Sequence, residues 1–132
     1  MSQAERPVGV LCAGPSSERE ISLRSGRAVH QALLASGLPA VLVELSREVG
    51  QIPQEIQRAG IGVAFIALHG SFGEDGTIQG ILEEMGIPYT GSQVEACRYG
   101  SDKVYSRRCW LAKGLPIPRW QMADPARSKR LT

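Results

Sequence analysis

"VGVLCAGPSSEREISLRSG", residues 8–26, begins with a short uninterrupted apolar run and continues through a Gly-Pro-Ser loop into a sequence with helical periodicity. Two further apolar runs follow it, AVLVEL at residues 40–45 and VAFIAL at residues 63–68. Short continuous apolar runs are typical of parallel strands that are buried on both faces of a sheet. Because helical segments separate these runs, the order of elements predicts an α/β fold with a parallel sheet.

The segment between the first two apolar runs predicts a long helix. Ser17 and Glu20 have the spacing of a capping box at its start, and Gly37 marks its end. The apolar side chains that share one face of this helix, and that are expected to pack on the sheet, are Ile21, Ala28, Val29, Ala32 and Leu33.

Shorter helices are predicted farther along the chain, at residues 53–60, 77–86 and 101–114, the last with Ser101 as its N-cap. PYTG, residues 88–91, is a candidate for a short fourth strand. The pattern therefore predicts a doubly wound sheet of about four parallel strands with helices on both faces. In such folds, ligand sites form beyond the carboxyl ends of the strands.

The composition is that of an ordinary globular chain, with 42% hydrophobic and 21% charged residues among 132. This length favours one domain with its own core. The apolar stretch near the N-terminus is too short for a signal peptide, and no segment approaches the roughly 18 apolar residues of a membrane span. The three cysteines lack a CxxC spacing, which argues against a disulfide framework or a zinc site and favours core thiols. A cytoplasmic protein is therefore expected.

The net charge of +2 conceals an asymmetry along the chain. Residues 1–97 carry eleven acidic side chains against six arginines, whereas residues 98–132 carry nine basic side chains against two acidic ones. A basic segment of this kind can attract nucleotide phosphates or nucleic acid, or it can simply be a solvated helix. Charge alone leaves these alternatives open.

Two loops follow predicted strands and are expected to lie at the same edge of the sheet. GPSSE, residues 14–18, follows the first strand, and HGSFGEDG, residues 69–76, follows the third. Since the carboxyl ends of parallel strands share one edge, Glu18 and His69 are expected to face one cleft. Glu18 either stabilises the first turn of its helix through the helix dipole or binds the ammonium group of a ligand.

His69 is either a structural histidine or a ligand-binding one, and the glycines around it favour a loop that wraps a small ligand. Glu74 and Asp75 are expected to cap the helix that follows rather than to bind a metal, because no second histidine stands at a useful spacing. The chain contains neither GxxxxGK[ST] nor GxGxxG, which weakens a P-loop or dinucleotide-binding interpretation.

Three segments that occur in order carry a resemblance to a known family: residues 8–26 quoted above, FIALHGSFGEDGTIQGILEEMGIPYTGS at residues 65–92, and SDKVYSRRCWLAKGLPIPRW at residues 101–120. Together they resemble the N-terminal part of D-alanine:D-alanine ligases, which belong to the ATP-grasp superfamily. The resemblance implies a Rossmann-like pre-ATP-grasp domain at residues 1–120. Residues 121–132 would then begin a linker to an ATP-grasp domain or form a frayed tail.

The resemblance also implies roles for individual residues. Glu18 would be the catalytic and substrate-binding carboxylate that holds the amino group of the first D-alanine. His69 and Gly70 would lie beside the carboxylate of the same substrate, and Lys103 matches a lysine that contacts ATP. Two positions depart from the family's loop, Ala13, which stands where the family has glycine, and Pro15.

The function implied by the resemblance is the ATP-dependent joining of two D-alanines for peptidoglycan synthesis. It implies ATP and Mg²⁺ as cofactors and a homodimer, without a nucleic-acid or membrane partner. The magnesium ligands and most ATP contacts are expected outside this sequence, so the 132-residue chain alone is expected to be inactive. The alternative is a stand-alone module, derived from the same domain, that binds another small ligand or a partner protein.

Overall fold

The computed structural model describes residues 6–123. The chain forms two compact units, one that ends at Asp102 and one that begins at Lys103. The first unit is an α/β domain that contains the sheet, and the described part of the second contains the helix α5 (Lys103–Ala112). The linker or tail predicted at residues 121–132 lies mostly outside the described residues.

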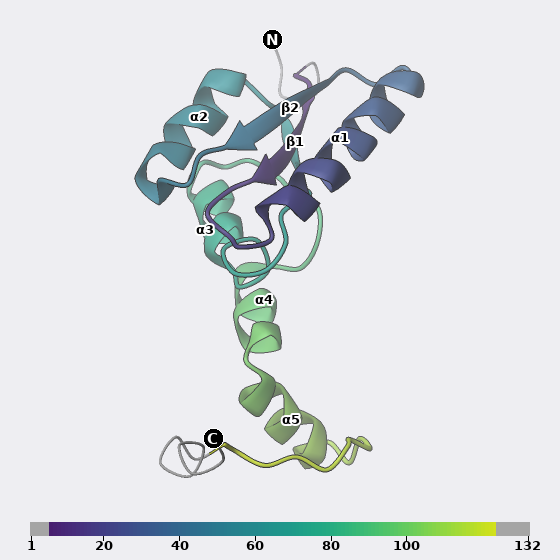
Figure 1. Ribbon diagram of the computed structural model, residues 1–132, viewed down its shortest axis with the longest axis vertical. Coiled ribbons are helices and arrows are strands. Elements are labelled where there is room, and N and C mark those ends of the chain that lie inside the picture. Colours follow the sequence, from purple (N-terminus) through teal and green to yellow (C-terminus); the bar gives the residue numbers. More distant parts are fainter. Residues whose placement is uncertain (1–5, 124–132) are drawn as a thin grey trace, which may run out of the picture. The chain divides into compact units, whose positions relative to one another are not determined.

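The sheet of the first unit is parallel, as predicted (Figure 1). Its strands are β1 (Val8–Ala13), β2 (Ala40–Leu45) and β3 (Val63–Ile66), in the order β2-β1-β3. The first two match the predicted runs, and the third ends earlier than predicted. β1 is the central strand, and Val10 and Leu11 are fully buried because each faces one side of the sheet.

The predicted fourth strand is wrong, because the described residues form a three-stranded sheet. Residues 88–91 make only an isolated parallel bridge between Ala64 and Tyr89. The Ala64 N–H donates to the Pro88 carbonyl, and the Thr90 N–H donates back to Ala64. Pro88 has no N–H of its own, so it cannot continue a ladder of hydrogen bonds.

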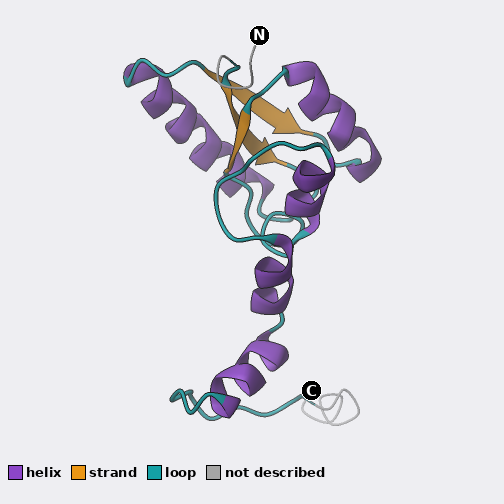
Figure 2. Ribbon diagram, turned by 180° about the vertical axis from the view of Figure 1, so that it is seen from behind, coloured by secondary structure: helices purple, strands orange, loops and turns teal. Residues whose placement is uncertain are grey.

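Helices cover both faces of the sheet, as predicted (Figures 1 and 2). On one face, α1 (Arg19–Ala35) packs its partly buried Leu23, Val29 and Leu33 against a buried cluster that includes Val10. On the other face lie α2 (Ile52–Ala59) and α3 (Thr77–Glu84). Their fully buried side chains, which pack with Leu11, are Ile52, Ile56, Ile78 and Leu82.

The start of α1 differs from the prediction. The helix begins at Arg19 with Glu18 as its N-cap, and the capping residue makes no side-chain cap hydrogen bond. The predicted capping box of Ser17 and Glu20 is therefore wrong. Instead, the Ser16 hydroxyl accepts a hydrogen bond from the Glu18 N–H at 3.0 Å, which fixes the turn that leads into the helix.

The face of α1 that packs on the sheet is also displaced from the predicted one. Val29 and Leu33 are partly buried as expected, but Ile21 is 47% exposed, and the buried residues of the helix are Ser22 and Gly26. A Cβ atom added at Gly26 would lie 2.5 Å from the Cys12 Cβ. Glycine at this position therefore lets the helix approach β1 closely.

Cys12 occupies the contact between β1 and α1. Its side chain is fully buried, and its Sγ donates a hydrogen bond to the Val43 carbonyl at 3.8 Å. Burial, reinforced by the charge of Glu44, raises the pKa of the Cys12 thiol to about 11. The expectation of core thiols holds for this residue only, because Cys97 is half-buried and Cys109 is exposed.

The helix predicted at residues 101–114 corresponds to α5, which begins at Lys103, and a helix that the sequence did not predict, α4 (Val94–Ser101), precedes it. Ser101 is the last residue of α4 rather than an N-cap, and its hydroxyl donates to the Arg98 carbonyl at 3.0 Å. Asp102 has an extended backbone that separates the two helices. The helices predicted at residues 53–60 and 77–86 are confirmed as α2 and α3.

None of the helices within residues 6–123 is both long and apolar enough to cross a membrane.

Candidate functional site

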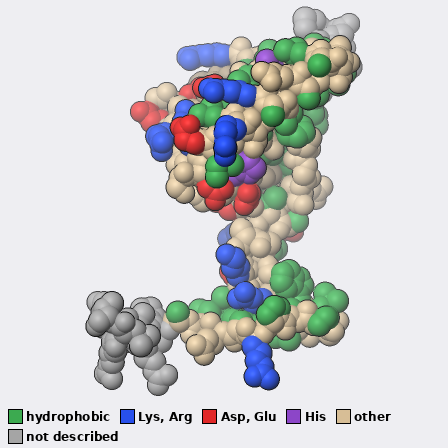
Figure 3. Space-filling model, turned by 45° about the vertical axis from the view of Figure 1, so that its right-hand side comes forward, with side chains coloured by type: hydrophobic (Ala, Val, Ile, Leu, Met, Phe, Trp, Pro, Cys, Tyr) green, Lys and Arg blue, Asp and Glu red, His purple; other side chains and the backbone are tan. Residues whose placement is uncertain are grey.

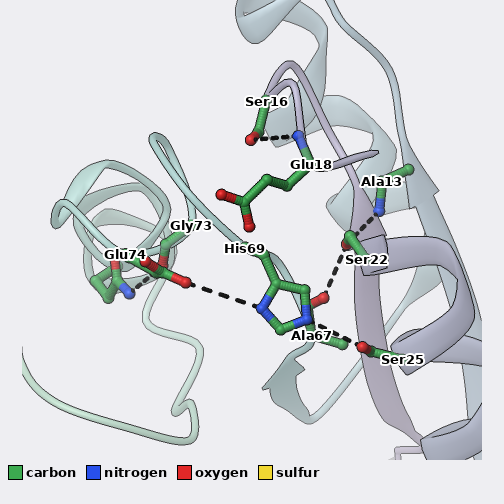
Figure 4. Close-up of polar contacts among 10 residues, drawn as sticks. Ala13, Ser16, Glu18, Ser22, Ser25, Ala67, His69, Gly73 and Glu74 are labelled. Atoms are coloured by element: carbon green, nitrogen blue, oxygen red, sulfur yellow. Dashed lines mark hydrogen bonds and ion pairs between the residues drawn. The ribbon is translucent and has the colours of Figure 1, made fainter. Parts of the chain in front are cut away.

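The loops after β1 and β3 meet at the carboxyl edge of the sheet. A Cβ atom added at Gly70 would lie 2.8 Å from the Ser16 Oγ and 3.3 Å from the Glu18 Oε1. Glu18 is exposed, and its carboxylate points toward the loop that holds His69 (Figure 4). The structure therefore brings Glu18, His69 and Gly70 together, as the topology of a parallel sheet requires.

The β1 loop begins with an unusual backbone conformation. Ala13 has φ of 71° and Gly14 has φ of 73°. An L-amino acid with a Cβ pays roughly 1–2 kcal/mol for this left-handed conformation, whereas glycine adopts it without that cost. The family pattern has glycine at this position, and glycine suits the left-handed backbone that Ala13 adopts here.

Ser22 ties the two loops to one helix. Its side chain is 1% exposed, and its hydroxyl accepts a hydrogen bond from the Ala13 N–H at 2.8 Å and donates one to the Ala67 carbonyl at 2.8 Å (Figure 4). One hydroxyl thus joins the end of β1 to the segment after β3. The prediction of an apolar helix face overlooked this role, although Ser22 stands two helical turns before Val29 and so lies on the same side of the helix.

Arg19 is a second residue that sequence reasoning missed. Its guanidinium donates to the carbonyl of Gly14 at 3.0 Å and to the carbonyl of Leu45 at 2.7 Å. Leu45 is the last residue of β2, so the guanidinium connects the β1 loop to the neighbouring strand. Glu18 is thereby presented on a loop that is held on two sides.

His69 is placed between two polar side chains. Its Nε2 atom is 3.0 Å from the Ser25 Oγ, and its Nδ1 atom is 3.8 Å from the Glu74 Oε1. Glu74 therefore lies beside His69 and is not a cap of α3, as the sequence had suggested. Charged side chains of both signs gather around a histidine on the face of the first unit in Figure 3.

Asp75 closes the β3 loop. Its Oδ2 accepts from the Phe72 N–H at 2.9 Å, and its Oδ1 accepts from the N–H and the hydroxyl of Thr77 at 3.0 and 2.6 Å. Partial burial acts to raise the pKa of Asp75, but these hydrogen bonds outweigh it, so the pKa lies below its usual value. The predicted capping role of Asp75 is confirmed, from the position just before the N-cap Gly76.

Asp75→Asn is expected to lower the free energy of unfolding by about 0.5–2 kcal/mol at neutral pH. Because the folded-state pKa of Asp75 is depressed, the stability it contributes is present above pH 3.8 and is lost as the pH falls through the folded-state value. Urea unfolding at pH 7 and pH 3 should therefore show a difference between Asp75→Asn and the unaltered chain that shrinks in acid. A difference that grows in acid would contradict this prediction.

Lys103 belongs to the second unit and is the first residue of α5. One turn later, the Arg107 guanidinium lies 5.6 Å from the centre of the Trp120 ring, within range of a cation–π interaction. Over residues 6–123, no three or more His, Cys, Asp or Glu side chains are grouped so as to hold a metal ion. The described residues thus offer a lysine for an anion but no metal centre.

Comparisons with known proteins agree with the fold and with the family resemblance. Residues 43–92 match the family model described as "D-ala D-ala ligase N-terminus". The chain is 48% identical over 117 residues to the D-alanine–D-alanine ligase of Geotalea uraniireducens. This match covers 89% of this chain and 37% of that protein. The chain is 45% identical over 131 residues to the corresponding ligase of Bordetella pertussis, covering 99% of this chain and 40% of that protein.

A solved structure gives the same result. The D-alanine–D-alanine ligase of Bacillus anthracis, crystallised as a complex with ATP, superposes with a TM-score of 0.78 at 30% identity. The match covers 96% of this chain and 44% of that one. This chain spans about 40% of the length of the curated relatives cited above. By sequence and by fold, the chain belongs to the family of D-alanine–D-alanine ligase N-terminal domains.

Proposed function

We propose that this chain is the substrate-binding part of an ATP-dependent ligase that joins two D-alanines, and that it holds the first of them. One observation carries the proposal. The exposed carboxylate of Glu18 and the imidazole of His69 are presented by two loops that touch at Gly70. The relatives that this chain matches over 89% and 99% of its length are named D-alanine–D-alanine ligases.

The chemistry of the two side chains suits the two ends of an amino acid. The Glu18 carboxylate accepts charge-assisted hydrogen bonds from the substrate ammonium, and the His69 ring donates to the substrate carboxylate. Gly70 keeps the space between them open, because a Cβ atom there would press on Ser16 and Glu18. These residues bind and orient the first D-alanine so that its carboxylate is presented for reaction.

ATP supplies the activation of that carboxylate when it is bound. Lys103 is proposed to contact its phosphates, since a lysine ammonium at the start of α5 can act as a point charge toward a phosphoryl oxygen. No magnesium ligand is assigned to this chain, because residues 6–123 provide no suitable group of side chains.

The remaining expectations from the family resemblance are part of this proposal. They are a substrate domain at residues 1–120 with a linker or tail at residues 121–132, a homodimer, a cytoplasmic location and a role in peptidoglycan synthesis. Exposed apolar side chains on the first unit, among them Leu34 and Leu38, are compatible with a second protomer.

The test is Glu18→Gln in a full-length ligase that carries this segment. The substitution keeps the shape of the side chain and removes its charge. We expect a loss of about 1.5–3 kcal/mol in binding of the substrate ammonium, so kcat/KM for D-alanine should fall roughly 10- to 150-fold. The melting temperature should hardly change, because Glu18 makes no side-chain cap hydrogen bond.

Glu20→Gln is the matched control. Glu20 is an exposed carboxylate in the first turn of the same helix, so it experiences the same helix dipole, and at two positions from Glu18 it projects in another direction. Its kinetics should remain those of the unaltered enzyme. Unchanged kinetics in Glu18→Gln, or an equal loss in both variants, would remove Glu18 from the binding site.

A further inference from the structure

We propose that Ser25 is a positioning residue for His69 and fixes its imidazole in the tautomer that carries the proton on Nδ1. The inference rests on the proposed function, because it concerns the ring assigned to the D-alanine carboxylate. Ser25 lies on α1 and His69 in the β3 loop, so the contact of Oγ with Nε2 joins residues 44 positions apart. The contact therefore depends on the fold that brings α1 and the β3 loop together.

The partners of the two ring nitrogens determine the tautomer. A carboxylate can only accept hydrogen bonds, so Glu74, 3.8 Å from Nδ1, favours a proton on that nitrogen. The Ser25 hydroxyl can donate, and at 3.0 Å it satisfies the lone pair of an unprotonated Nε2. Figure 4 shows Nδ1 on the side of Glu74 and Nε2 on the side of Ser25.

The same arrangement leaves a hydrogen-bond donor available for the substrate. The distance of 3.8 Å between Nδ1 and the Glu74 carboxylate is too long for a hydrogen bond. The His69 side chain is 34% exposed, so the Nδ1–H group is accessible while Ser25 occupies the other nitrogen. Ser25 thus directs the donating nitrogen away from α1 and toward the loops.

A neighbouring contact makes this positioning rigid. Ser22 and Ser25 are three positions apart on α1 and therefore project from adjacent places on one side of the helix. The Ser22 hydroxyl donates to the Ala67 carbonyl, two residues before His69. Two hydroxyl groups on one helix consequently hold the backbone before the histidine and the histidine ring itself.

The tautomer can be measured directly on the 132-residue chain by long-range ¹H–¹⁵N NMR of the imidazole rings. The chain has two histidines, and the other one is an internal reference. The His30 Nε2 lies 3.2 Å from the Ala40 carbonyl, which only accepts, so the His30 ring carries its proton on Nε2. We expect the neutral His69 ring to show the opposite pattern, with its proton on Nδ1.

Ser25→Ala removes the hydroxyl and should convert His69 to the Nε2–H form, because water replaces the donor and free imidazole side chains favour that tautomer. Ser25→Thr keeps a hydroxyl and should retain Nδ1–H. Ser36→Ala, at the end of the same helix, removes a hydroxyl that donates to the Ala32 carbonyl at 2.9 Å. This control should leave the tautomers of His30 and His69 unchanged. A changed His69 tautomer in Ser36→Ala would show that a loss of helix stability is enough to disturb the ring.

In a full-length ligase that carries this segment, Ser25→Ala should raise the KM for D-alanine about three- to tenfold, with a smaller change in kcat. Ser25→Thr should restore most of the loss. An Nε2–H ring in the unaltered chain, an unchanged tautomer in folded Ser25→Ala, or a changed tautomer with an unchanged KM would each overturn the inference. Unchanged kinetics in Glu18→Gln would instead defeat the proposed function and leave the tautomer result standing.

Discussion

Ser22→Ala is expected to lower the free energy of unfolding of the chain by about 2–4 kcal/mol. The substitution leaves the Ala13 N–H and the Ala67 carbonyl without their partner, and both lie in a region where Ser22 is only 1% exposed. Each buried backbone group that loses its hydrogen bond costs its full desolvation penalty. Urea denaturation followed by circular dichroism measures the difference.

Ser36→Ala is the control for Ser22→Ala, because it removes an exposed hydroxyl from the same helix. Its effect should stay within about 0.5 kcal/mol. If both serine variants lost equal stability, the loss would reflect the helix and not the connection between the loops. If Ser22→Ala were as stable as the unaltered chain, the hydroxyl would have no structural role.

Gly26→Val should lower the free energy of unfolding by about 3 kcal/mol or more. Even a single Cβ atom at this position would lie 2.5 Å from the Cys12 Cβ and 3.0 Å from its Sγ. Cys12 is on the central strand and fully buried, so the helix must move away from the sheet to admit the new side chain. Thermal and urea unfolding should both show the loss.

Gly80→Val in α3 is the matched control, since a Cβ atom at Gly80 would meet nothing within 4 Å. The same substitution in the interior of a helix should there change stability by no more than about 0.5 kcal/mol. A comparable loss at both glycines would mean that valine destabilises these helices through its backbone preferences. The close approach of α1 to β1 would then not be the cause.

The strands could be predicted because they are mostly apolar, and β1 and β2 match the predicted runs at both ends. β1 is the central strand and buries both of its faces, so no polar position interrupts its pattern, whereas the edge strand β2 carries one exposed polar residue, Glu44, near its end. The segment with Pro88 could not be assigned in the same way. Its apolar and aromatic residues fit a strand, but a proline cannot donate to a neighbour, and only one bridge forms.

The packing of α1 shows where hydrophobic periodicity fails. The prediction selected apolar residues such as Ile21, whereas the helix buries Ser22 and Gly26. Ser22 is buried because its hydroxyl bonds to the Ala13 N–H and the Ala67 carbonyl. Gly26 is buried because the Cys12 side chain packs directly against it. Both reasons depend on neighbours that are distant in sequence.

The candidate site was predictable in outline. Topology alone places the loops after β1 and β3 at one edge, and the structure brings Glu18 and His69 to that edge. The residues that hold them, Arg19 and Ser25, carried no local pattern, because their hydrogen bonds reach Leu45 and His69 across the fold. The roles of Glu18, His69, Gly70 and Lys103 in binding remain predictions.

The buried thiol of Cys12 has a practical consequence for measuring motion in this domain. Alkylating reagents attack thiolates, and a thiol with a pKa near 11 beneath a helix offers almost none at neutral pH. Modification must therefore wait until α1 separates from the sheet, while the exposed Cys109 reacts immediately. With Cys97 and Cys109 replaced by serine, the rate of labelling measures this opening, and the frequency at which the helix lifts can be read from a cysteine that the chain already contains.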